Sequence, residues 1–409
     1  MGKMFADHLI VSIDVGTTKI CVLVGQQIDH NHVEIIGIGK SPSDGLKKGV
    51  VVDIARTVHS IKKAVKEAEI TSGHSIESAY IGISGGHIQS MNSHGMVPIK
   101  GGSVRQIDIT NALEAAKAIS IPEGHYLLHV LPQYFTIDGS ERVHDPLGMH
   151  GLRLEVQAHL ITGAIASAQN LIKCCEMAGV TVQDIILEQL ASASAVLSDD
   201  ERELGVGVID IGGGTSDFAL YQHGTIRHTM VLPVAGNHFT NDVAVGLRTT
   251  LKDAERVKLE HGCAYTPLLE ATTIEVELVQ GTGNQLINSR DLLHIIEPRA
   301  VELLTLVHED ITAKALLPMM RSGLVLTGGG ALLKGMPELA CALFSLPVRV
   351  GFPRPEYGII DTLNSPIYAT GYGLLLQGIK KRSNHIDTWS GPTIKRVLMR
   401  MKSWIADFF

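Results

Sequence analysis

The sequence lacks the features that mark secreted, membrane-spanning and disulfide-rich chains. Its 409 residues include five cysteines, an odd number without the paired spacing of a disulfide framework. No apolar run approaches the roughly 18 residues that a membrane-spanning helix needs. The first ten residues carry charged side chains and no long apolar stretch, so they do not form a secretory signal. These absences predict a cytoplasmic protein.

Several motifs of well-known enzyme classes are missing or incomplete. Neither the P-loop pattern G-x-x-x-x-G-K-[ST] nor a strand–GxGxxG–helix unit occurs. His125 and His129 stand four apart, but no glutamate occupies position 126, so zinc is not expected. The stretch 82–86 matches the G-x-S-x-G hydrolase pattern, yet a strand-like segment follows it where that pattern requires a helix. A zinc enzyme and a serine hydrolase are therefore both disfavoured.

The charge of the chain is unevenly distributed. The formal net charge is −7, but residues 380–409 alone carry a net +5, which leaves −12 for the rest. An acidic body repels nucleic acid, so no nucleic-acid partner is expected. The basic C-terminal segment favours an anionic surface instead.

A strand, an aspartate and a glycine/threonine turn occur twice. The apolar run 9–13 ends at Asp14 and is followed by Gly-Thr-Thr-Lys at 16–19. The run 205–209 ends at Asp210 and is followed by Gly-Gly-Gly-Thr-Ser-Asp at 212–217. Each pattern predicts a β-hairpin. Because the two aspartates stand 196 positions apart, close to half the chain, the pattern indicates a duplicated domain.

The chemistry of these turns points to phosphate. Glycines let backbone N–H groups converge on an anion, and threonine or serine hydroxyls add donors. Asp14 and Asp210 are expected to hold a hydrated magnesium ion through water, and Lys19 to neutralise a terminal phosphate. The alternative is a pair of ordinary hairpins whose polar residues only satisfy the turn. The predicted phosphate-binding residues are Asp14, Gly16, Thr17, Thr18, Lys19, Asp210, Gly212, Gly213, Gly214, Thr215 and Ser216.

A third glycine cluster follows an apolar run at 324–327. Gly328, Gly329 and Gly330 are expected to form a turn before a helix, where a flat ring can lie against the backbone without Cβ atoms in the way. Taken alone, this pattern equally fits close packing of a strand against a helix.

The region 85–161 differs in pattern from its flanks. It holds short strands, a helix with Ile109, Leu113 and Ala116 on one face, and a loop rich in Asp, Gly and Pro at 138–151. A βαβ-type inserted subdomain fits this order.

The C-terminal residues form a polar linker and an amphipathic pattern. Residues 382–393 show no apolar period, and Thr393 can cap a helix over 394–409. A terminal helix packed on its own domain is the alternative, but the cationic face and the aromatic end favour a membrane surface. The predicted membrane-binding residues are Ile394, Lys395, Arg396, Val397, Leu398, Arg400, Met401, Lys402, Trp404, Ile405, Phe408 and Phe409.

The two aspartate turns and the glycine loop at 327–330 resemble the actin-like ATPase superfamily. Within it, the sequence is similar nearly end to end to the FtsA family of bacterial cell-division proteins, through segments 13–19, 49–53, 82–88 and 213–217 and the C-terminal helix. The resemblance implies an α/β fold: an actin-like, ribonuclease H-like duplicated, two-lobed ATPase with an inserted subdomain and a C-terminal amphipathic helix.

The resemblance also implies roles for residues outside the turns. Glu188 opens a segment similar to the first inter-domain helix, whose acidic residue orients the attacking water in related ATPases. Gln189 stands where the family usually has proline, which weakens the expectation of hydrolysis by Glu188. Glu255 and Lys258 share a helix face and are expected at the ribose. The other implied nucleotide contacts are Gly236, Asn237, Gly328, Gly329, Gly330 and Met336.

The expected domain boundaries follow from these assignments. They are 1–84 with 162–200 for the first lobe, 85–161 for the insert, 201–236 with 308–381 for the second lobe, 237–307 for its small subdomain, 382–393 for the linker and 394–409 for the membrane helix.

The function implied by the resemblance is that of an ATP- and Mg²⁺-binding scaffold with at most weak ATPase activity. It is expected to polymerise on the cytoplasmic face of the inner membrane at the division site. Its expected partners are the C-terminal segment of FtsZ at 237–307, later division proteins at 85–161, further copies of itself and anionic lipid. Two alternatives share the fold: a type IV pilus assembly-like scaffold and a small-molecule, sugar-type kinase.

Overall fold

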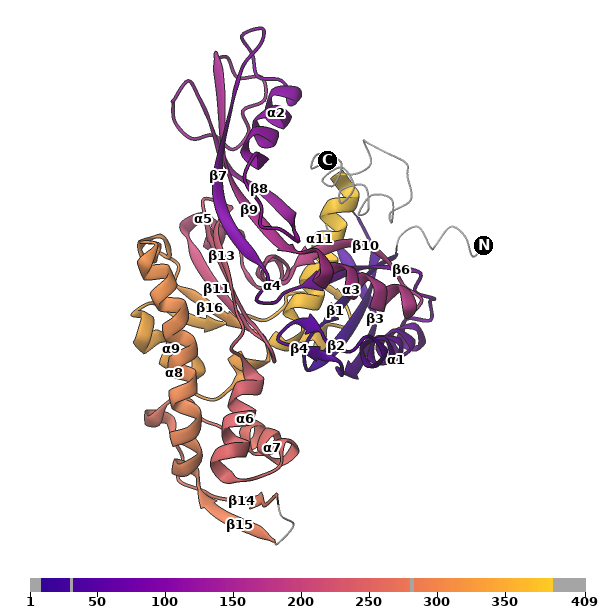
Figure 1. The fold of residues 1–409 in the computed structure, drawn as a ribbon, viewed down its shortest axis with the longest axis vertical. Helices are drawn as coiled ribbons and strands as arrows, with labels where there is room; N and C mark the ends of the chain where they lie inside the picture. Colours follow the sequence, from indigo (N-terminus) through magenta and orange to yellow (C-terminus); the bar gives the residue numbers. More distant parts are fainter. Residues whose placement is uncertain (1–8, 30–31, 280–282, 385–409) are drawn as a thin grey trace.

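The computed structural model describes residues 9–29, 32–279 and 283–384. Two lobes lie side by side, and each is built around a mixed β-sheet (Figure 1). An inserted subdomain extends from one end of the molecule and a small helical subdomain from the other (Figure 1). The predicted membrane helix at 394–409 and most of the predicted linker fall outside the described residues.

The first lobe contains a six-stranded sheet in the order β10-β6-β1-β2-β3-β18. Strands β1, β2 and β3 form an antiparallel meander, and β6 and β10 add to β1 as parallel strands. The strands are β1 (Leu9–Val15), β2 (Lys19–Gln27), β3 (Val33–Pro42), β6 (Ser78–Ile83), β10 (Thr181–Leu187) and β18 (Tyr357–Gly358), and a separate two-stranded pair consists of β4 (Leu46–Lys47) and β5 (Val50–Val51).

The second lobe repeats this topology. Its five-stranded sheet has the order β13-β12-β11-β16-β17, with an antiparallel meander of three strands and two parallel strands beside the first of them. The strands are β11 (Val206–Ile211), β12 (Ser216–Gln222), β13 (Thr225–Leu232), β16 (Leu324–Thr327) and β17 (Val348–Val350). Since both sheets follow the order third–second–first–fourth–fifth, the predicted duplication is confirmed.

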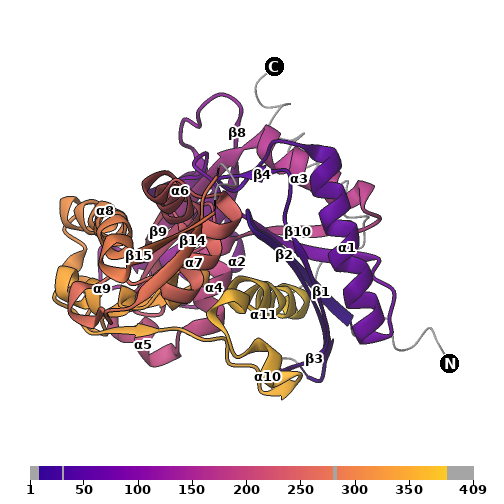
Figure 2. The same cartoon turned by 90° about the horizontal axis from the view of Figure 1, so that it is seen from below.

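Helices cover both faces of the first sheet. Helix α1 packs against β2 and β3 on one face, and α11 lies across β1, β2 and β6 on the other, toward the second lobe (Figure 2). Asp53 caps α1 by accepting the N–H of Arg56 at 3.1 Å, and Gly73 ends the helix with φ = 70°. The first-lobe helices are α1 (Ile54–Ser72), α3 (Ile165–Met177), α4 (Glu188–Val196) and α11 (Ala369–Asn384).

The inserted subdomain is a three-stranded antiparallel sheet with one helix on it. Strand β9 lies between β7 and β8, so β7 and β8 run parallel without touching and α2 connects them as a split βαβ unit. Its core forms a separate cluster that includes Ala112, Ala116 and Leu154. The elements are β7 (Gln89–Pro98), α2 (Gln106–Lys117), β8 (His125–Ile137) and β9 (Arg153–Ala164).

The small subdomain of the second lobe is mainly helical. The long helix α8 packs against α6 and α9, and a two-stranded hairpin extends from its start (Figure 1). Its elements are α6 (Gly236–Leu247), α7 (Leu251–His261), the short turn η2 (Thr266–Leu268), β14 (Thr273–Glu277), β15 (Asn284–Asn288) and α8 (Ser289–Ala313). The remaining helices are α5 (Asp199–Leu204), η3 (Leu317–Met319), η4 (Gly329–Leu332), α9 (Met336–Phe344), α10 (Ile360–Leu363) and η5 (Pro366–Tyr368).

Helices α4 and α11 cross between the two lobes. A Cβ atom on Gly373 would lie 1.8 Å from the carbonyl oxygen of Ala191, so the backbones touch at this crossing. Ser12 of the first lobe donates to the carbonyl of Gly371 at 2.8 Å, and Thr370 donates to Asp210 of the second lobe at 2.9 Å. The start of α11 therefore contacts both lobes.

The structure corrects two boundaries. Within 308–381, expected in the second lobe, β18 and α11 pack on the first-lobe sheet, and the end of α11 corrects the start of the linker. The helix continues through Asn384, so the linker expected from residue 382 begins as helix. Lys381 pairs with Asp184, and Arg382 donates to the carbonyl of Leu9 at 3.2 Å, which holds this turn against the first lobe. Among the described residues, no helix is long and apolar enough to cross a membrane.

Candidate functional site

The two aspartate turns have the same geometry. In the first, the N–H of Gly16 donates to the carbonyl of Lys19 at 3.0 Å. In the second, the N–H of Gly212 donates to the carbonyl of Thr215 at 2.9 Å. Each turn joins two antiparallel strands, and each aspartate stands next to the end of its first strand. The repeated pattern in the sequence thus corresponds to a repeated backbone conformation.

The two turns face each other across the space between the lobes. A Cβ atom on Gly213 would lie 2.4 Å from the side chain of Thr18, and one on Gly214 would lie 2.2 Å from Thr17 Oγ1. Any larger residue at these positions would push the lobes apart. The glycines of the second turn therefore permit close approach of the first.

A cavity of about 610 Å³ lies between the lobes and is lined by both turns. Helix α7, the loop at 328–330 and the segment before α11 complete its wall. The structure brings together here the following predicted residues: Asp14, Gly16, Thr17, Thr18, Lys19, Glu188, Asp210, Gly212, Gly213, Gly214, Thr215, Gly236, Asn237, Glu255, Lys258, Gly328, Gly329 and Gly330.

Two predicted contacts do not line this cavity. Ser216 is the first residue of β12, and its buried hydroxyl donates to the carbonyl of Val234 at 2.7 Å. Met336 is the first residue of α9 and is fully buried in the core of the second lobe. Each residue continues a motif along the chain, but its side chain is buried away from the cavity, so a contact of either with nucleotide stays a prediction.

Four carboxyl groups gather at the floor of the cavity: Asp14, Glu188, Asp210 and Asp217. Burial raises the pKa of Asp210 to about 6. The hydrogen bond from Thr370 opposes this rise, and the negative charge of Asp14 adds to it. Burial, partly offset by the bond from Ser84, raises the pKa of Asp217 to about 7. Burial, with the negative charges of Asp14, Asp217 and Asp210, raises the pKa of Glu188 well above its usual range.

Lys19 is the cation at the centre of this acidic group. Its ammonium lies 3.6 Å from Asp14 Oδ2, donates to the carbonyl of Ile367 and sits 5.3 Å from the ring centre of Tyr368. Burial disfavours the charged amine, but the acidic groups around it, Asp14 foremost, together outweigh burial and raise the pKa of Lys19. Burial likewise raises the pKa of Asp14, with Lys19 opposing it. One lysine cannot neutralise four carboxylates, so the floor favours an added cation.

The carboxylates suit a metal ion that keeps its water shell. No group of three or more Asp, Glu, His or Cys side chains in the described part of the chain converges closely enough to bind a metal directly. Mg²⁺ commonly retains several waters and uses one or two carboxylates. The donor set therefore fits a hydrated magnesium ion held by Asp14 and Asp210 through water.

Helix α7 presents Glu255 and Lys258 to the cavity. Their side chains pair at 2.7 Å, and Lys258 also donates to Thr240 Oγ1 at 3.0 Å. The hydroxyl of Thr240 contacts Glu255 as well, which fixes both charged side chains against α6.

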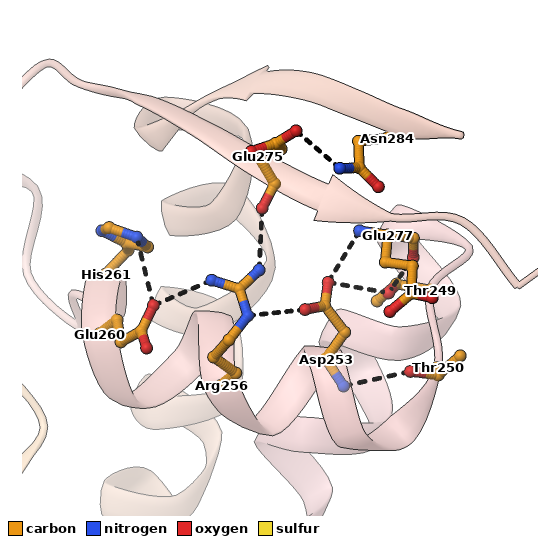
Figure 3. A network of polar contacts seen from close by, with 9 residues as sticks. All are labelled: Thr249, Thr250, Asp253, Arg256, Glu260, His261, Glu275, Glu277 and Asn284. Atoms are coloured by element: carbon orange, nitrogen blue, oxygen red, sulfur yellow. Dashed lines mark hydrogen bonds and ion pairs between the residues drawn. The ribbon is translucent and has the colours of Figure 1, made fainter. Parts of the chain in front are cut away.

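The opposite face of α7 is anchored to the β14–β15 hairpin (Figure 3). Arg256 contacts Asp253 at 2.7 Å and the carbonyl of Glu275 at 2.9 Å, and Asp253 accepts the N–H of Glu277 at 2.9 Å. Burial alone would raise the pKa of Asp253, but these donors hold it below its usual value. This network sets the position from which α7 reaches the cavity.

The third glycine cluster packs against the second aspartate. Gly328 has φ = 78°, and a Cβ atom there would lie 2.3 Å from Asp210 Oδ1. A Cβ atom on Gly330 would lie 2.3 Å from the side chain of Ile211. The glycines are thus required by the close approach of β11 and leave an open wall of backbone at the cavity.

Sequence reasoning missed several residues that line the site or hold its side chains, among them Asp217, Ser84 and Thr370. Asp217 lines the cavity and accepts the hydroxyl of Ser84 at 2.5 Å across the two lobes. Thr370 holds Asp210 from the start of α11. Asp217 had a signal, since it ends the second glycine motif. Ser84 was visible in the G-x-S-x-G pattern, which the structure accounts for as a contact between lobes followed by strand β7.

Comparison with known proteins places this geometry in a family. The chain is 43% identical to "Cell division protein FtsA" of Pseudomonas aeruginosa over 417 aligned positions, covering 100% of both chains. It is 38% identical to the protein of the same name from Escherichia coli K12, covering 99% of this chain and 97% of that one. The chain belongs to the FtsA family. The family model "Cell division protein FtsA" matches residues 207–373, and the model "SHS2 domain inserted in FTSA" matches residues 85–162.

Solved structures of lower identity share the fold of this FtsA-family chain. The structure titled "PilM-PilN type IV pilus biogenesis complex" gives a TM-score of 0.67 at 17% identity and covers 90% of this chain and 98% of that one. The structure of MreB5 of Spiroplasma citri bound to ADP gives a TM-score of 0.57 at 17% identity and covers 92% of this chain and 99% of that one. These likenesses confirm the actin-like fold. Family membership favours cell division over the pilus-assembly and sugar-kinase alternatives.

Proposed function

We propose that the protein is an ATP-binding, actin-like scaffold for cell division. The observation that carries this proposal is the single cavity walled by two copies of one turn, in a chain that aligns end to end with a cell-division FtsA protein. Because the two turns meet across one cleft, a single ligand can contact both lobes at once. A ligand that contacts both lobes stabilises the closed conformer by its differential affinity.

The residues present fit ATP with magnesium. The backbone N–H groups and hydroxyls of 16–18 and 212–215 would hold the phosphates, with Lys19 beside them. Asp14 and Asp210 would hold the magnesium ion through water, Glu255 and Lys258 the ribose, and the backbone at 328–330 the adenine ring. Bound magnesium would supply positive charge that balances the four acidic side chains of the cavity floor. The structural relative MreB5 is described as bound to ADP, which supports a nucleotide in this cleft.

The electrostatics of Glu188 favour holding ATP over rapid hydrolysis. A general base must be ionised near neutral pH, and the pKa of Glu188 is raised well above its usual range by burial. Gln189 is fully buried beside it, and neither of its amide atoms has a hydrogen-bond partner among the described residues. We infer at most a slow ATPase, with nucleotide serving mainly to set the conformation.

Three surfaces would connect this scaffold to its partners. The small subdomain at 237–307 would bind the C-terminal segment of FtsZ, and the insert at 85–161 would recruit later division proteins. Both assignments follow the family, whose relatives are named for cell division. The basic, amphipathic segment 394–409 would bind anionic lipid on the cytoplasmic face of the inner membrane. Polymerisation would multiply these weak contacts.

The function is tested by electron microscopy of the full-length protein on an anionic lipid monolayer. We expect filaments on the lipid when ATP and Mg²⁺ are present and few or none without nucleotide. Filaments that form equally well without nucleotide, or only in solution away from lipid, would contradict the proposal.

The membrane segment is tested separately by flotation with anionic liposomes. Trp404→Glu places a charge in the apolar stripe, and we expect the protein to stay with the dense fraction. Ser403→Glu adds the same charge on the opposite side of the helical pattern and should still float, apart from a modest loss of about 1 kcal/mol per unit charge. Flotation of both variants alike would remove the anchor.

A further inference from the structure

A short turn behind Glu188 connects the first lobe to the insert. It follows β6, runs from Ser84 to Ile88 and leads into β7. A second, much smaller cavity of about 10 Å³ lies behind it and is lined by four polar residues, Ser84, His87, Ser167 and Glu188, together with glycine and apolar residues. A volume of this size holds about one water molecule, provided that polar partners surround it.

The hydrogen bonds of His87 define its tautomer. Its Nδ1 accepts the backbone N–H of Ala164 at 3.3 Å, so the ring proton lies on Nε2. Nε2 is buried and has no hydrogen-bond partner among the described residues. Burial, together with the nearby His125, lowers the pKa of His87 and keeps the ring neutral. An unpaired buried N–H group of this kind costs about 1–3 kcal/mol.

Two acceptors lie on the same small cavity. They are the carboxylate of Glu188 and the hydroxyl oxygen of Ser84. Glu188 Oε1 lies beside Gly82, 3.2 Å from where a Cβ atom of that residue would stand, and His87 Nε2 lies at the same distance from the Cβ position of Gly85. Ser84 lies between these two glycines. Its hydroxyl donates to Asp217 Oδ1 at 2.5 Å and lies 3.4 Å from Thr215 Oγ1, and a hydroxyl oxygen has two lone pairs with which to accept.

We propose that one buried water in this cavity accepts the Nε2–H of His87 and donates to Glu188 and to the hydroxyl oxygen of Ser84. His87 and Ser84 are then positioning residues of the acidic floor. Three hydrogen bonds satisfy such a water. The role of Glu188 toward ATP rests on the proposed function, whereas the hydrogen-bond chain stands without it.

This series of hydrogen bonds runs in one direction and affects the ionisation of Glu188. Protons are donated from His87 to the water, from the water to Ser84 and from Ser84 to Asp217 in the other lobe. The branch to Glu188 favours its ionised form, because a hydrogen bond to a carboxylate stabilises the charge. The root of the insert is thereby linked to the residue that would orient the attacking water and to the closure of the cleft.

The test is carried out by NMR on the full-length protein without nucleotide. In ¹⁵N-histidine-labelled protein, the Nε2–H tautomer of His87 should dominate, and its Nε2 proton should carry the downfield shift of a hydrogen-bonded group. In ¹³C-glutamate-labelled protein, with Glu188→Gln to assign the resonance, His87→Phe should raise the apparent pKa of Glu188 by about one unit or more. His87→Gln places an amide N–H near the Nε2 position and should restore most of the shift.

Three results would overturn the proposal: an Nδ1–H tautomer, a Glu188 titration that is identical in His87→Phe and the wild type, or a shift that His125→Phe reproduces. If His87→Phe does not fold, the tautomer of His87 in the wild type and the titration of Glu188 in His87→Gln still test the proposal. Failure of ATP to bind would refute the proposed function but leave these measurements standing, so the two failures are distinguishable.

Discussion

At the scale of single residues, the site is dominated by carboxyl groups that are costly to keep buried. Asp14, Asp210 and Asp217 are each less than a tenth exposed, and Lys19 is the cation that lies among them. Burial is the main cause of their raised pKa values, so keeping these carboxyl groups ionised in the cleft costs free energy. On the proposed function, a bound magnesium nucleotide would offset this cost. The same residues would then reduce stability in the nucleotide-free state and provide affinity in the bound state.

Removal of one charge should separate these two effects. Asp210→Asn keeps an acceptor for Thr370 and removes the carboxylate. At pH 8 we expect the nucleotide-free variant to be about 1–3 kcal/mol more stable than the wild type, because a group with a native pKa near 6 is ionised there at a cost. Its affinity for ATP with Mg²⁺ should fall at least about tenfold by calorimetry.

Asp310→Asn is the matched control, since Asp310 pairs with His228 outside the cavity. It should lower stability and leave the affinity for ATP with Mg²⁺ unchanged. An Asp210→Asn protein that is less stable and binds nucleotide as well as the wild type would contradict the account of the site.

The pH dependence of stability follows from the sign of the shifts. An acid whose pKa is raised on folding contributes stability that is present below its unfolded pKa and is lost as the pH rises through its folded pKa. For Asp217 this window extends from 3.8 to about 7. Urea unfolding without nucleotide should therefore show a larger fall in stability from pH 5.5 to 8 for the wild type than for Asp217→Asn, by about 2 kcal/mol.

The wild type must be compared with Asp217→Asn, because buried histidines such as His159 also make stability depend on pH. Their contribution is the same in both proteins, so it cancels in the difference. Parallel pH profiles for the wild type and Asp217→Asn would show that Asp217 is not held at a raised pKa.

At the scale of elements, the crossing of α4 and α11 sets the relation of the lobes. Gly373 meets the backbone of Ala191, and the next turns of both helices pack around this point. Gly373→Ala cannot be accommodated by moving a side chain, because the nearest atom is a backbone oxygen at 1.8 Å. We expect a loss of about 3 kcal/mol or more in the free energy of unfolding, measured in denaturant.

Gly86→Ala serves as the control, since a Cβ atom there would have nothing within 4 Å. It should change stability by less than about 1 kcal/mol. An equal effect of the two substitutions would mean that the crossing is not tightly packed.

Local patterns allowed the prediction of those elements whose sequence signal is long or repeated. The aspartate hairpins appear where their repeated pattern placed them, and helices begin at Glu188 and carry Glu255 and Lys258 as the family resemblance implied. The two-residue strand β18 has no such signal, and it forms because Tyr357–Gly358 reaches the edge of β3 in the other lobe. The helical start of the linker likewise depends on tertiary contacts of Lys381 and Arg382.

The candidate site could be predicted to a similar degree. The residues of the repeated turns were accessible because the repeat itself is a signal. Ser84 with Asp217 and Thr370 with Asp210 are contacts across 133 and 160 positions, and no local pattern encodes them. The side chains of Ser216 and Met336 do not line the cavity, because a motif specifies the path of the backbone more reliably than the direction of each side chain.

At the scale of the whole molecule, the insert bridges the lobes. It is rooted in the first lobe, and its sheet contacts the edge strand β13 of the second. Ser90 and Gln133 each donate to a β13 carbonyl at 2.8 Å, and His159 Nε2 lies 2.9 Å from the hydroxyl of Thr229. A rotation of the lobes must disturb these polar contacts. Nucleotide in the cleft and partners on the insert are therefore expected to influence each other.

The central claim is that both aspartate turns hold one metal–triphosphate group between the lobes. The most direct measurement is anomalous diffraction from crystals of the protein with Mn²⁺ and a non-hydrolysable ATP analogue. We predict one manganese peak between Asp14 and Asp210, with waters bridging it to both carboxylates and the phosphates in contact with both turns. A metal bound to one lobe alone, or phosphates that contact a single turn, would contradict the account.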